Sequence, residues 1–193
     1  MSLFRLPDRR SSPLAAQSVS LEQALTELAP HVRACVYRYV GPRADADDIV
    51  QEALIEVASA LARFRGESSL KTYAIRISLR VATRHLRSAR RREQPGLHAV
   101  PAAADTRTPE SLAAHRESLR RLYRCLDRLS PKRRTAFVLC AVERLSHAEA
   151  AEIEGTSVET MRARLKRARA ELGRLLRADP HLSQLLSREE QDA

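Results

Sequence analysis

A proline-rich stretch in the middle of the chain limits the folds that this sequence can adopt. Residues 93–111, EQPGLHAVPAAADTRTPES, carry Pro95, Pro101 and Pro109 and show no helical period. Proline removes a backbone donor and interrupts helices and sheet interiors, so this stretch is predicted to be a linker. The chain is therefore expected to contain two blocks, at 19–92 and 112–178, with a mobile tail at 1–18 and a second tail at 179–193.

Both blocks are predicted to be all-α, as two small helical domains with a modest core each. The 193-residue chain has only five glycines and 4% aromatic residues, and the alternation typical of strands is nowhere sustained. In the first block, helices are expected from about Leu21 to Gly41, from Asp45 to about Phe64, and from Ser68 or Ser69 to the arginines at 90–92.

The charge of the chain restricts its partners. It has 34 Lys and Arg residues against 24 Asp and Glu residues, which gives a formal net charge of +10. A polyanionic binding partner is therefore expected, with nucleic acid as the leading candidate. No segment approaches the roughly 18 uninterrupted apolar residues of a membrane-spanning helix. The first residues hold no apolar run of the length that a secretory signal needs, so a cytoplasmic protein without membrane insertion is expected.

The sequence indicates no chemical centre. Cys35, Cys125 and Cys140 lie far apart and suggest neither a disulfide framework nor a metal knuckle, so they are expected to be small core residues. His31 and Cys35 share a helical face, but no further metal ligands stand near them. No nucleophile with a base and no paired carboxylates emerge, so no catalytic residue, cofactor or metal is expected and an enzyme is a weak hypothesis.

The second expected helix has two unlike faces. Its apolar side, from Ile49 to Leu61, is predicted to pack in the core. The opposite side carries Asp48, Gln51, Glu52 and Glu56, with the apolar Ile55 among them. Such a face can simply be solvated, but an acidic patch with an apolar centre on a basic protein is also typical of a protein-docking surface. It is not expected to face nucleic acid.

The third expected helix carries a line of positive charge opposite its apolar stripe. The line consists of Arg76, Arg80, Arg84 and Arg87, at i, i+4, i+8 and i+11. Like charges at this spacing repel each other, so the line suggests a compensating anion such as a phosphate backbone. A solvated basic face is the alternative.

A basic turn with two aromatic residues, RFRGESSLKTY, precedes that helix. Phe64 and Tyr73 lie among basic residues around Gly66, an arrangement that suits stacking on unpaired bases. Both rings could equally lie in the core, which their spacing alone favours.

The last two helices of the second block have the layout of a helix-turn-helix. LSHAEAAEIEG and TSVETMRARLKRARAEL are joined by Gly155 and a short polar turn, and Thr156 with Glu159 is predicted to form a capping box. Met161 and Leu165 lie on the apolar face of the second helix, and its arginines and lysine lie opposite. Side chains in the first turns of such a helix reach base edges in the major groove. DNA binding is therefore predicted, with a solvated basic helix that closes a bundle as the alternative.

Three segments, taken in order, resemble the sigma factors of bacterial RNA polymerase, specifically the short extracytoplasmic-function (ECF, group IV) class. DADDIVQEALIEV is similar to that family's DAEDLVQETFL-type segment, and RFRGESSLKTYAIRI resembles its RFRGESSFRTWLYRI-type segment. LSHAEAAEIEGTSVETMRARLKRAR resembles its closing helix-turn-helix. The resemblance covers roughly 20–92 and 112–178, and it implies that 19–92 is sigma region 2 and 112–178 is sigma region 4.

The resemblance implies a role for each face. The protein would bind core RNA polymerase, through the β′ clamp helices and the β flap, as well as promoter DNA, and an anti-sigma factor would hide these faces. The residues implied in clamp-helix docking are Asp48, Gln51, Glu52 and Ile55. Those implied in recognising and opening the −10 element, with a flipped base near the turn, are Phe64, Gly66, Ser68, Ser69, Lys71, Arg76, Arg80 and Arg84. Those implied in reading the −35 element are Thr160, Arg162, Ala163, Arg164, Lys166 and Arg167.

Some positions depart from the family pattern. Tyr73 stands where the family usually has Trp, and Leu79-Arg80 replaces the usual Arg-Asn, so the resemblance does not fix a −10 preference. Ala150 and Glu154 replace bulkier aliphatic residues before Gly155. The alternative hypothesis is a stand-alone helix-turn-helix regulator whose N-terminal block binds a ligand or dimerises. Such a regulator would bind its operator without polymerase, whereas a sigma factor of this class should bind duplex promoter DNA poorly alone.

Overall fold

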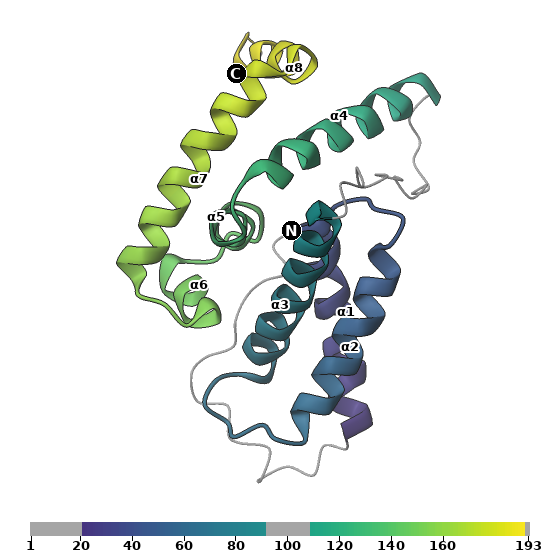
Figure 1. The fold of residues 1–193 in the computed structure, drawn as a ribbon, viewed down its shortest axis with the longest axis vertical. Coiled ribbons are helices and arrows are strands. Elements are labelled where there is room, and N and C mark those ends of the chain that lie inside the picture. The colour runs from purple at the N-terminus through teal and green to yellow at the C-terminus, as the bar shows by residue number, and fades with distance from the viewer. Residues whose placement is uncertain (1–20, 92–108, 192–193) are drawn as a thin grey trace.

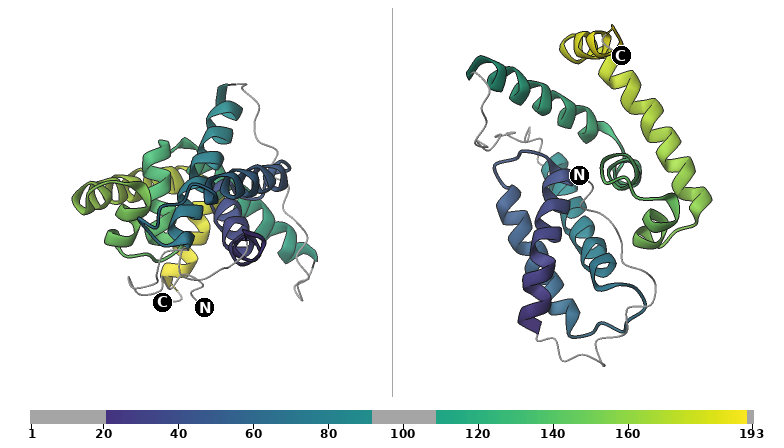
Figure 2. Two further views of the ribbon diagram at one scale, coloured as in Figure 1. Left: turned by 90° about the horizontal axis from the view of Figure 1, so that it is seen from below. Right: turned by 180° about the vertical axis from the view of Figure 1, so that it is seen from behind.

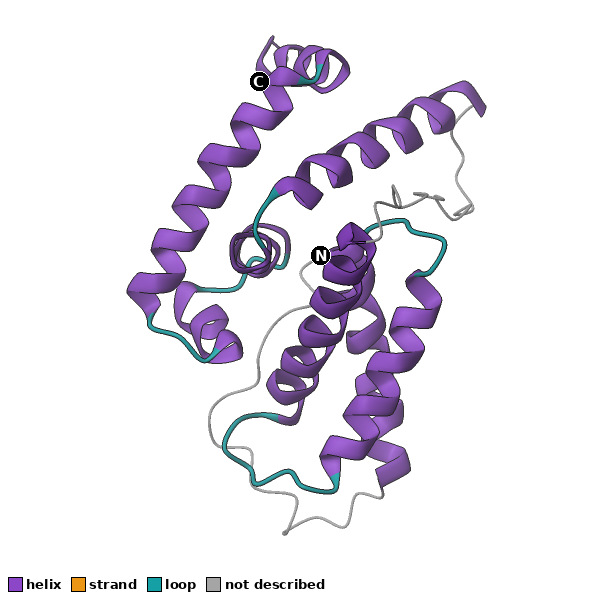
Figure 3. Ribbon diagram, viewed as in Figure 1, coloured by secondary structure: helices purple, strands orange, loops and turns teal. Residues whose placement is uncertain are grey.

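The computed structural model describes residues 21–91 and 109–191 (Figure 1). Within these two ranges the chain forms helices joined by turns, and no strand is present (Figure 3). The prediction of an all-α fold is therefore confirmed. The predicted tail at 1–18 and residues 93–108 of the predicted linker lie outside the described residues. None of the helices in the described ranges is both long and apolar enough to cross a membrane.

The N-terminal half is a bundle of three mutually packed helices, α1 (Leu21–Val40), α2 (Ala46–Leu61) and α3 (Leu70–Arg91) (Figure 2). α1 ends at the predicted place because Gly41 adopts a φ of +81°, a conformation that glycine enters without strain. α2 ends before the predicted Phe64. The backbone N–H groups of Arg63 and Phe64 donate to carbonyls three residues earlier, at 3.0 and 3.1 Å, which tightens the chain into a turn.

The start of α3 is capped by a serine side chain. Ser69 Oγ accepts a hydrogen bond from the backbone N–H of Thr72 at 3.0 Å and donates to Thr72 Oγ1 at 2.9 Å. Of the two serines predicted as caps, Ser69 therefore fills the role and satisfies one of the free N–H groups at the helix start.

The C-terminal half contains α4 (Pro109–Arg128), α5 (Pro131–Phe137), a π-helical turn η2 (Val138–Val142), α6 (His147–Glu154), α7 (Val158–Ala178) and α8 (Pro180–Gln191). α7 runs along one side of the molecule, with α5 and α6 beside it and α8 folded back at its end (Figure 1). The residues predicted as a C-terminal tail thus form a helix up to Gln191.

The predicted helix-turn-helix is present as α6 and α7. Gly155 ends α6 with a φ of +62°, the left-handed conformation for which glycine is suited. The start of α7 differs from the prediction, because Ser157 and not Thr156 caps it. Ser157 Oγ accepts a hydrogen bond from the backbone N–H of Thr160 at 3.1 Å, which shifts the cap by one residue.

The two halves share one apolar core. A single cluster of buried side chains continues from α1, α2 and α3 into α5, η2, α6 and α7. Tyr39 and Ile75 from the N-terminal half and Leu139, Ile153 and Met161 from the C-terminal half are all fully buried within it. The two predicted helical domains therefore pack against each other through a continuous apolar cluster. A smaller cluster, with Cys125 among its members, lies where α4, α7 and α8 meet.

Candidate nucleic-acid and protein interfaces

The predicted DNA-reading helix presents its basic side chains to solvent. Arg162, Lys166 and Arg167 of α7 are exposed, whereas Met161 and Leu165 are buried against the rest of the C-terminal half. Ala163 is exposed and Thr160 is half-buried beside the cap. A helix held by a glycine turn, with guanidinium groups on its outer face, can enter a DNA major groove.

One arginine of α7, Arg164, forms an ion pair within the protein. Arg164 Nη1 lies 3.5 Å from Glu154 Oε2 at the end of α6, and both side chains are largely buried. Burial raises the pKa of the Glu154 carboxyl, although the nearby positive charge of Arg164 opposes this effect. Glu154 stands where an aliphatic residue was expected, and Arg164 compensates its charge. Arg164 therefore stabilises the turn between the two helices.

The arginine line of α3 is exposed, but its first member has partners inside the molecule. Arg76 Nε donates to the carbonyl oxygen of Ile153 at 2.8 Å, and its Nη2 donates to that of Glu152 at 2.6 Å. These carbonyls belong to the last turn of α6, where backbone acceptors have no partner within the helix. Arg76 thus caps α6 from the other half of the molecule.

Another arginine of the line pairs with the acidic face of α2. Arg84 Nη2 donates to Glu56 Oε1 at 2.7 Å and also contacts Glu52, which is bonded to His85 as well. Hydrogen bonding to His85 and Arg84 holds the pKa of Glu52 below its usual range despite partial burial. Among the described residues, Arg80 and Arg87 are exposed and form no ion pair.

The acidic face of α2 is open to solvent as predicted. Asp48 and Gln51 are exposed, and Ile55 keeps 66% of its surface accessible, the largest fraction among the exposed large apolar residues of the described ranges. Glu52 is half-buried because α3 covers one side of it. The structure therefore brings the four residues of the predicted docking face together on one surface.

A polar pocket of about 380 Å³ lies at the turn between α2 and α3. Phe64 and Tyr73 line it, with ring centroids 5.0 Å apart and planes tilted by 49°. Both rings are half-buried, so they are accessible from the pocket as well as packed. The other residues that line it are Arg63, Arg65, Glu67, Ser68, Arg76 and Glu152.

The other residues predicted for this site flank the pocket. Gly66 forms the turn beside it with a φ of +75°, while Ser69 serves as the helix cap. Burial lowers the pKa of nearby Lys71.

Charged residues that the sequence did not single out hold the two halves together. Arg134 is 1% exposed, and its Nε donates to the carbonyl of Tyr39, in the last turn of α1, at 2.9 Å. Its guanidinium also pairs with Asp127. Arg90 of α3 makes a similar contact between the halves: its Nη2 donates to the carbonyl of Leu129, just after α4, at 3.1 Å. Spacing alone could not have revealed these residues, because a buried arginine and an exposed one carry the same signal in the sequence.

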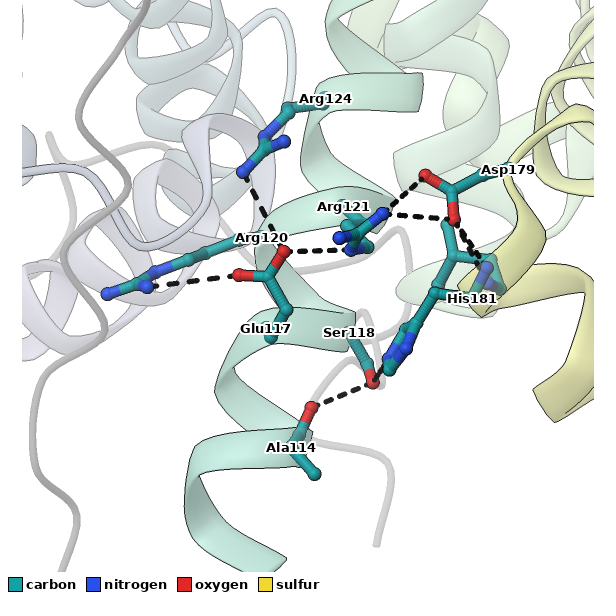
Figure 4. A network of polar contacts seen from close by, with 9 residues as sticks. Ala114, Glu117, Ser118, Arg120, Arg121, Arg124, Asp179 and His181 are labelled. Atoms are coloured by element: carbon teal, nitrogen blue, oxygen red, sulfur yellow. Dashed lines mark hydrogen bonds and ion pairs between the residues drawn. The ribbon is translucent and has the colours of Figure 1, made fainter. Parts of the chain in front are cut away.

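The C-terminal helix α8 is anchored by a polar network (Figure 4). Asp179 accepts hydrogen bonds from the backbone N–H groups of His181 and Leu182 at 3.0 and 3.1 Å, and its carboxylate pairs with Arg121 at 3.3 Å. Ser118 of α4 bonds to the ring of His181 at 2.9 Å. These contacts keep α8 against α4 and α7. In the described part of the chain, no group of three or more candidate ligands could hold a metal ion.

Known families match both halves. The family described as sigma-70 region 2 matches residues 25–92, and the family described as sigma-70, region 4, matches residues 119–172. The ECF RNA polymerase sigma-E factor of Escherichia coli (strain K12) is 33% identical over 147 residues, which cover 72% of this chain and 76% of that relative. The ECF RNA polymerase sigma factor SigG of Mycobacterium tuberculosis (strain ATCC 25618 / H37Rv) is 32% identical over 159 residues. That match covers 70% of this chain but only 43% of SigG, so the chain spans less than half the length of that relative.

Two solved structures share the fold. CnrH in complex with the cytosolic domain of CnrY is 26% identical, with a TM-score of 0.57 over 82% of this chain and 88% of the other. The sigma factor RpoE of Bartonella quintana, in complex with the anti-sigma factor NepR, is 24% identical, with a TM-score of 0.59 over 82% of this chain and 97% of the other.

Proposed function

Because the chain belongs to the ECF class of bacterial RNA polymerase sigma factors, we propose that it binds core RNA polymerase and directs it to a small set of promoters. Region 2 would span 19–92 and region 4 would span 112–178, separated by a linker at 93–111. The protein would act in the cytoplasm, where polymerase and promoters are, and would perform no covalent chemistry. A stand-alone regulator is not favoured, since both halves match sigma regions.

The exposed face of α2 is the proposed polymerase contact. Asp48, Gln51, Glu52 and Ile55 would dock on the β′ clamp helices, and region 4 would contact the β flap. The face combines carboxylates with an accessible apolar centre, Ile55, which suits burial against a basic partner surface. An anti-sigma factor, like the one bound to RpoE, would compete for such faces.

The pocket between α2 and α3 is the proposed site for the −10 element. A flipped non-template base would enter it beside Phe64, and the tilted Phe64–Tyr73 pair supplies an aromatic surface on which a base can stack. Ser68 lies in its wall, and Gly66 forms the turn beside it with a positive φ. Ser69 and Lys71, at the start of α3, would complete the site. Arg80 and Arg84 would then bind the DNA backbone along α3, and Arg76, which also caps α6, would contact DNA from the pocket wall. Opening the duplex costs a few kcal/mol, which docking on polymerase would offset.

The first turns of α7 form the proposed contact with the −35 element. Arg162, Ala163, Lys166 and Arg167 would face the major groove, with Thr160 and the α7 start near a backbone phosphate. Arg164 would act indirectly, by holding the turn through Glu154.

One observation carries the proposal: an acidic face with an apolar centre and a basic helix-turn-helix lie on separate exposed surfaces of one chain. Run-off transcription with core polymerase, followed by mapping of start sites, tests it. Shared elements at −35 and −10 upstream of the start sites are expected. The combined change Gln51→Ala and Glu52→Ala should abolish most transcription, whereas Glu27→Ala, which removes an exposed carboxylate of α1, should not. Unchanged polymerase binding by the double variant would contradict the proposal.

A further inference from the structure

The acidic face of α2 and the arginine line of α3 are joined by one group of ion pairs, here called the Glu52 cluster (Glu52, Glu56, Arg84 and His85). Arg84 Nη2 donates to Glu56 Oε1 at 2.7 Å and also to Glu52 Oε1. Glu52 Oε2 contacts His85 Nε2. Both carboxylate oxygens of Glu52 are therefore engaged by α3, although Glu52 also belongs to the proposed polymerase contact.

We propose that core polymerase and Arg84 share Glu52, so that docking of α2 on polymerase and binding of promoter DNA by α3 assist each other. The inference deepens the proposed function and rests on it. When a basic group of polymerase takes Glu52, Arg84 loses one of its two carboxylates and becomes available to a DNA phosphate. When a phosphate takes Arg84, Glu52 becomes available to polymerase. Linkage requires the two effects to be equal in size.

The charges of the cluster explain why Arg84 must lose a carboxylate partner before it can bind a DNA phosphate. Two carboxylates face one guanidinium and one imidazole, so the cluster presents no net positive charge even though Arg84 belongs to the basic line. The anion that the spacing of the arginines suggested is thus supplied, at this position, by the protein itself. A phosphate that binds Arg84 must compete with the carboxylates of Glu52 and Glu56, which already contact its guanidinium.

The exposure of the cluster allows its partners to be exchanged. The side chains of Arg84, Glu52 and Glu56 are 48%, 38% and 34% exposed. Ion pairs at such positions are weak, because water and salt screen them, so a polymerase group or a phosphate can replace one partner. The expected coupling is correspondingly modest, about 2- to 5-fold in affinity.

Equilibrium binding of the fluorescein-labelled full chain to core polymerase provides one test. Arg84→Gln frees Glu52 and is expected to tighten core binding by about 2- to 5-fold. Arg87→Gln is the matched control, since Arg87 lies further along the same exposed line and forms no ion pair among the described residues. Equal effects of the two variants, or weaker binding by Arg84→Gln, overturn the sharing of Glu52. A wild-type chain that does not bind core at all contradicts the proposed function itself.

Binding of the free chain to labelled oligothymidine, measured over a range of salt concentrations, tests the other side. Glu56→Gln removes a carboxylate from Arg84 without altering the proposed polymerase contact. It is expected to steepen the slope of log affinity against log salt by about 0.7, the value for one added phosphate on single-stranded DNA. Adding Arg84→Gln should remove this gain, and Glu27→Gln, with the same charge change on α1, should not produce it. A gain that survives Arg84→Gln, or that Glu27→Gln reproduces, overturns the proposal.

Discussion

The guanidinium of Arg38 in α1 donates two hydrogen bonds to the carboxylate of Glu143, at 2.8 and 3.0 Å, across a sequence separation of 105 residues. Glu143 follows η2 and is nearly enclosed, with 5% of its side chain exposed. Burial raises the pKa of its carboxyl, and the charge of Arg38 opposes this effect. The contact fastens the two halves of the chain to each other next to the shared core.

Arg38→Gln should loosen the contact between the halves. The substitution leaves a buried carboxylate without its charged partner, so the free energy of unfolding is expected to fall by about 1–3 kcal/mol. Urea denaturation measures this loss, and an increased radius of gyration in small-angle scattering would show that the halves separate. Arg33→Gln is the matched control, because its pair with Asp47 is 59% and 68% exposed and should contribute less than about 1 kcal/mol. Equal losses for both variants would contradict this account.

Arg134→Met should be among the most damaging single changes at this contact. It removes the buried donor that caps the carbonyl of Tyr39 and the ion pair with Asp127, at an expected cost of about 2–4 kcal/mol. The neighbouring Arg133→Met removes a partly exposed pair with Glu171 and should cost about 1 kcal/mol or less. Denaturation midpoints of the two variants give the comparison. A smaller loss for Arg134→Met than for Arg133→Met would show that the cap contributes little.

The faces of the individual helices could be predicted from the sequence because burial repeats with the helical period. Ile55 and Arg162 lie on exposed faces, and Met161 lies in the core, as their spacing indicates. The packing of the halves could not be predicted in this way. Arg76 and Arg134 bond to backbone carbonyls 77 and 95 residues away, and a backbone carbonyl has no signature in the sequence. The spacing of the arginine line therefore suggested phosphate partners for Arg76 and Arg84, which already have partners within the protein.

Arg164 and Arg167, which lie about one helical turn apart on α7, should respond differently to substitution. Arg167→Ala removes an exposed side chain proposed to face DNA, so it should weaken binding of region 4 to its −35 element and reduce the salt slope by about 1. Arg164→Ala removes the partner of the half-buried Glu154 and should lower thermal stability more than DNA affinity. Fluorescence anisotropy of a mapped promoter duplex with the chain bound to core polymerase, and thermal unfolding of the free chain, provide the two measurements. Loss of affinity without loss of stability in Arg164→Ala would place Arg164 in the DNA contact after all.

The cap of α8 should weaken in acid. Burial alone would raise the pKa of Asp179, but hydrogen bonds from the N–H groups of Leu182 and His181 and the charge of Arg121 outweigh it and lower the pKa. A lowered pKa means that the cap stabilises the protein above the ordinary aspartate value of about 3.9, and that this contribution is lost as the pH falls through the lowered value. The amide resonances of His181 and Leu182 should therefore titrate with a midpoint below about 3.9. Arg121→Gln should raise that midpoint, and Asp179→Asn should abolish the titration.

Gly41→Ala should destabilise the protein more than Gly155→Ala, although both glycines adopt left-handed conformations. At Gly155 an added Cβ meets no atom within 4 Å, so only the backbone strain of about 1–2 kcal/mol is expected. At Gly41 the Cβ would lie 2.3 Å from the ring of Tyr123, which packs onto the end of α1 from the C-terminal half, and overpacking adds about 1–3 kcal/mol. The overpacking cost arises from the contact between the new Cβ at position 41 and the ring of Tyr123. Tyr123→Ala should therefore lower the free energy of unfolding less in the Gly41→Ala background than in the wild type. Strictly additive free energies in this double-mutant cycle, measured by urea denaturation, would show that Tyr123 does not press on the turn.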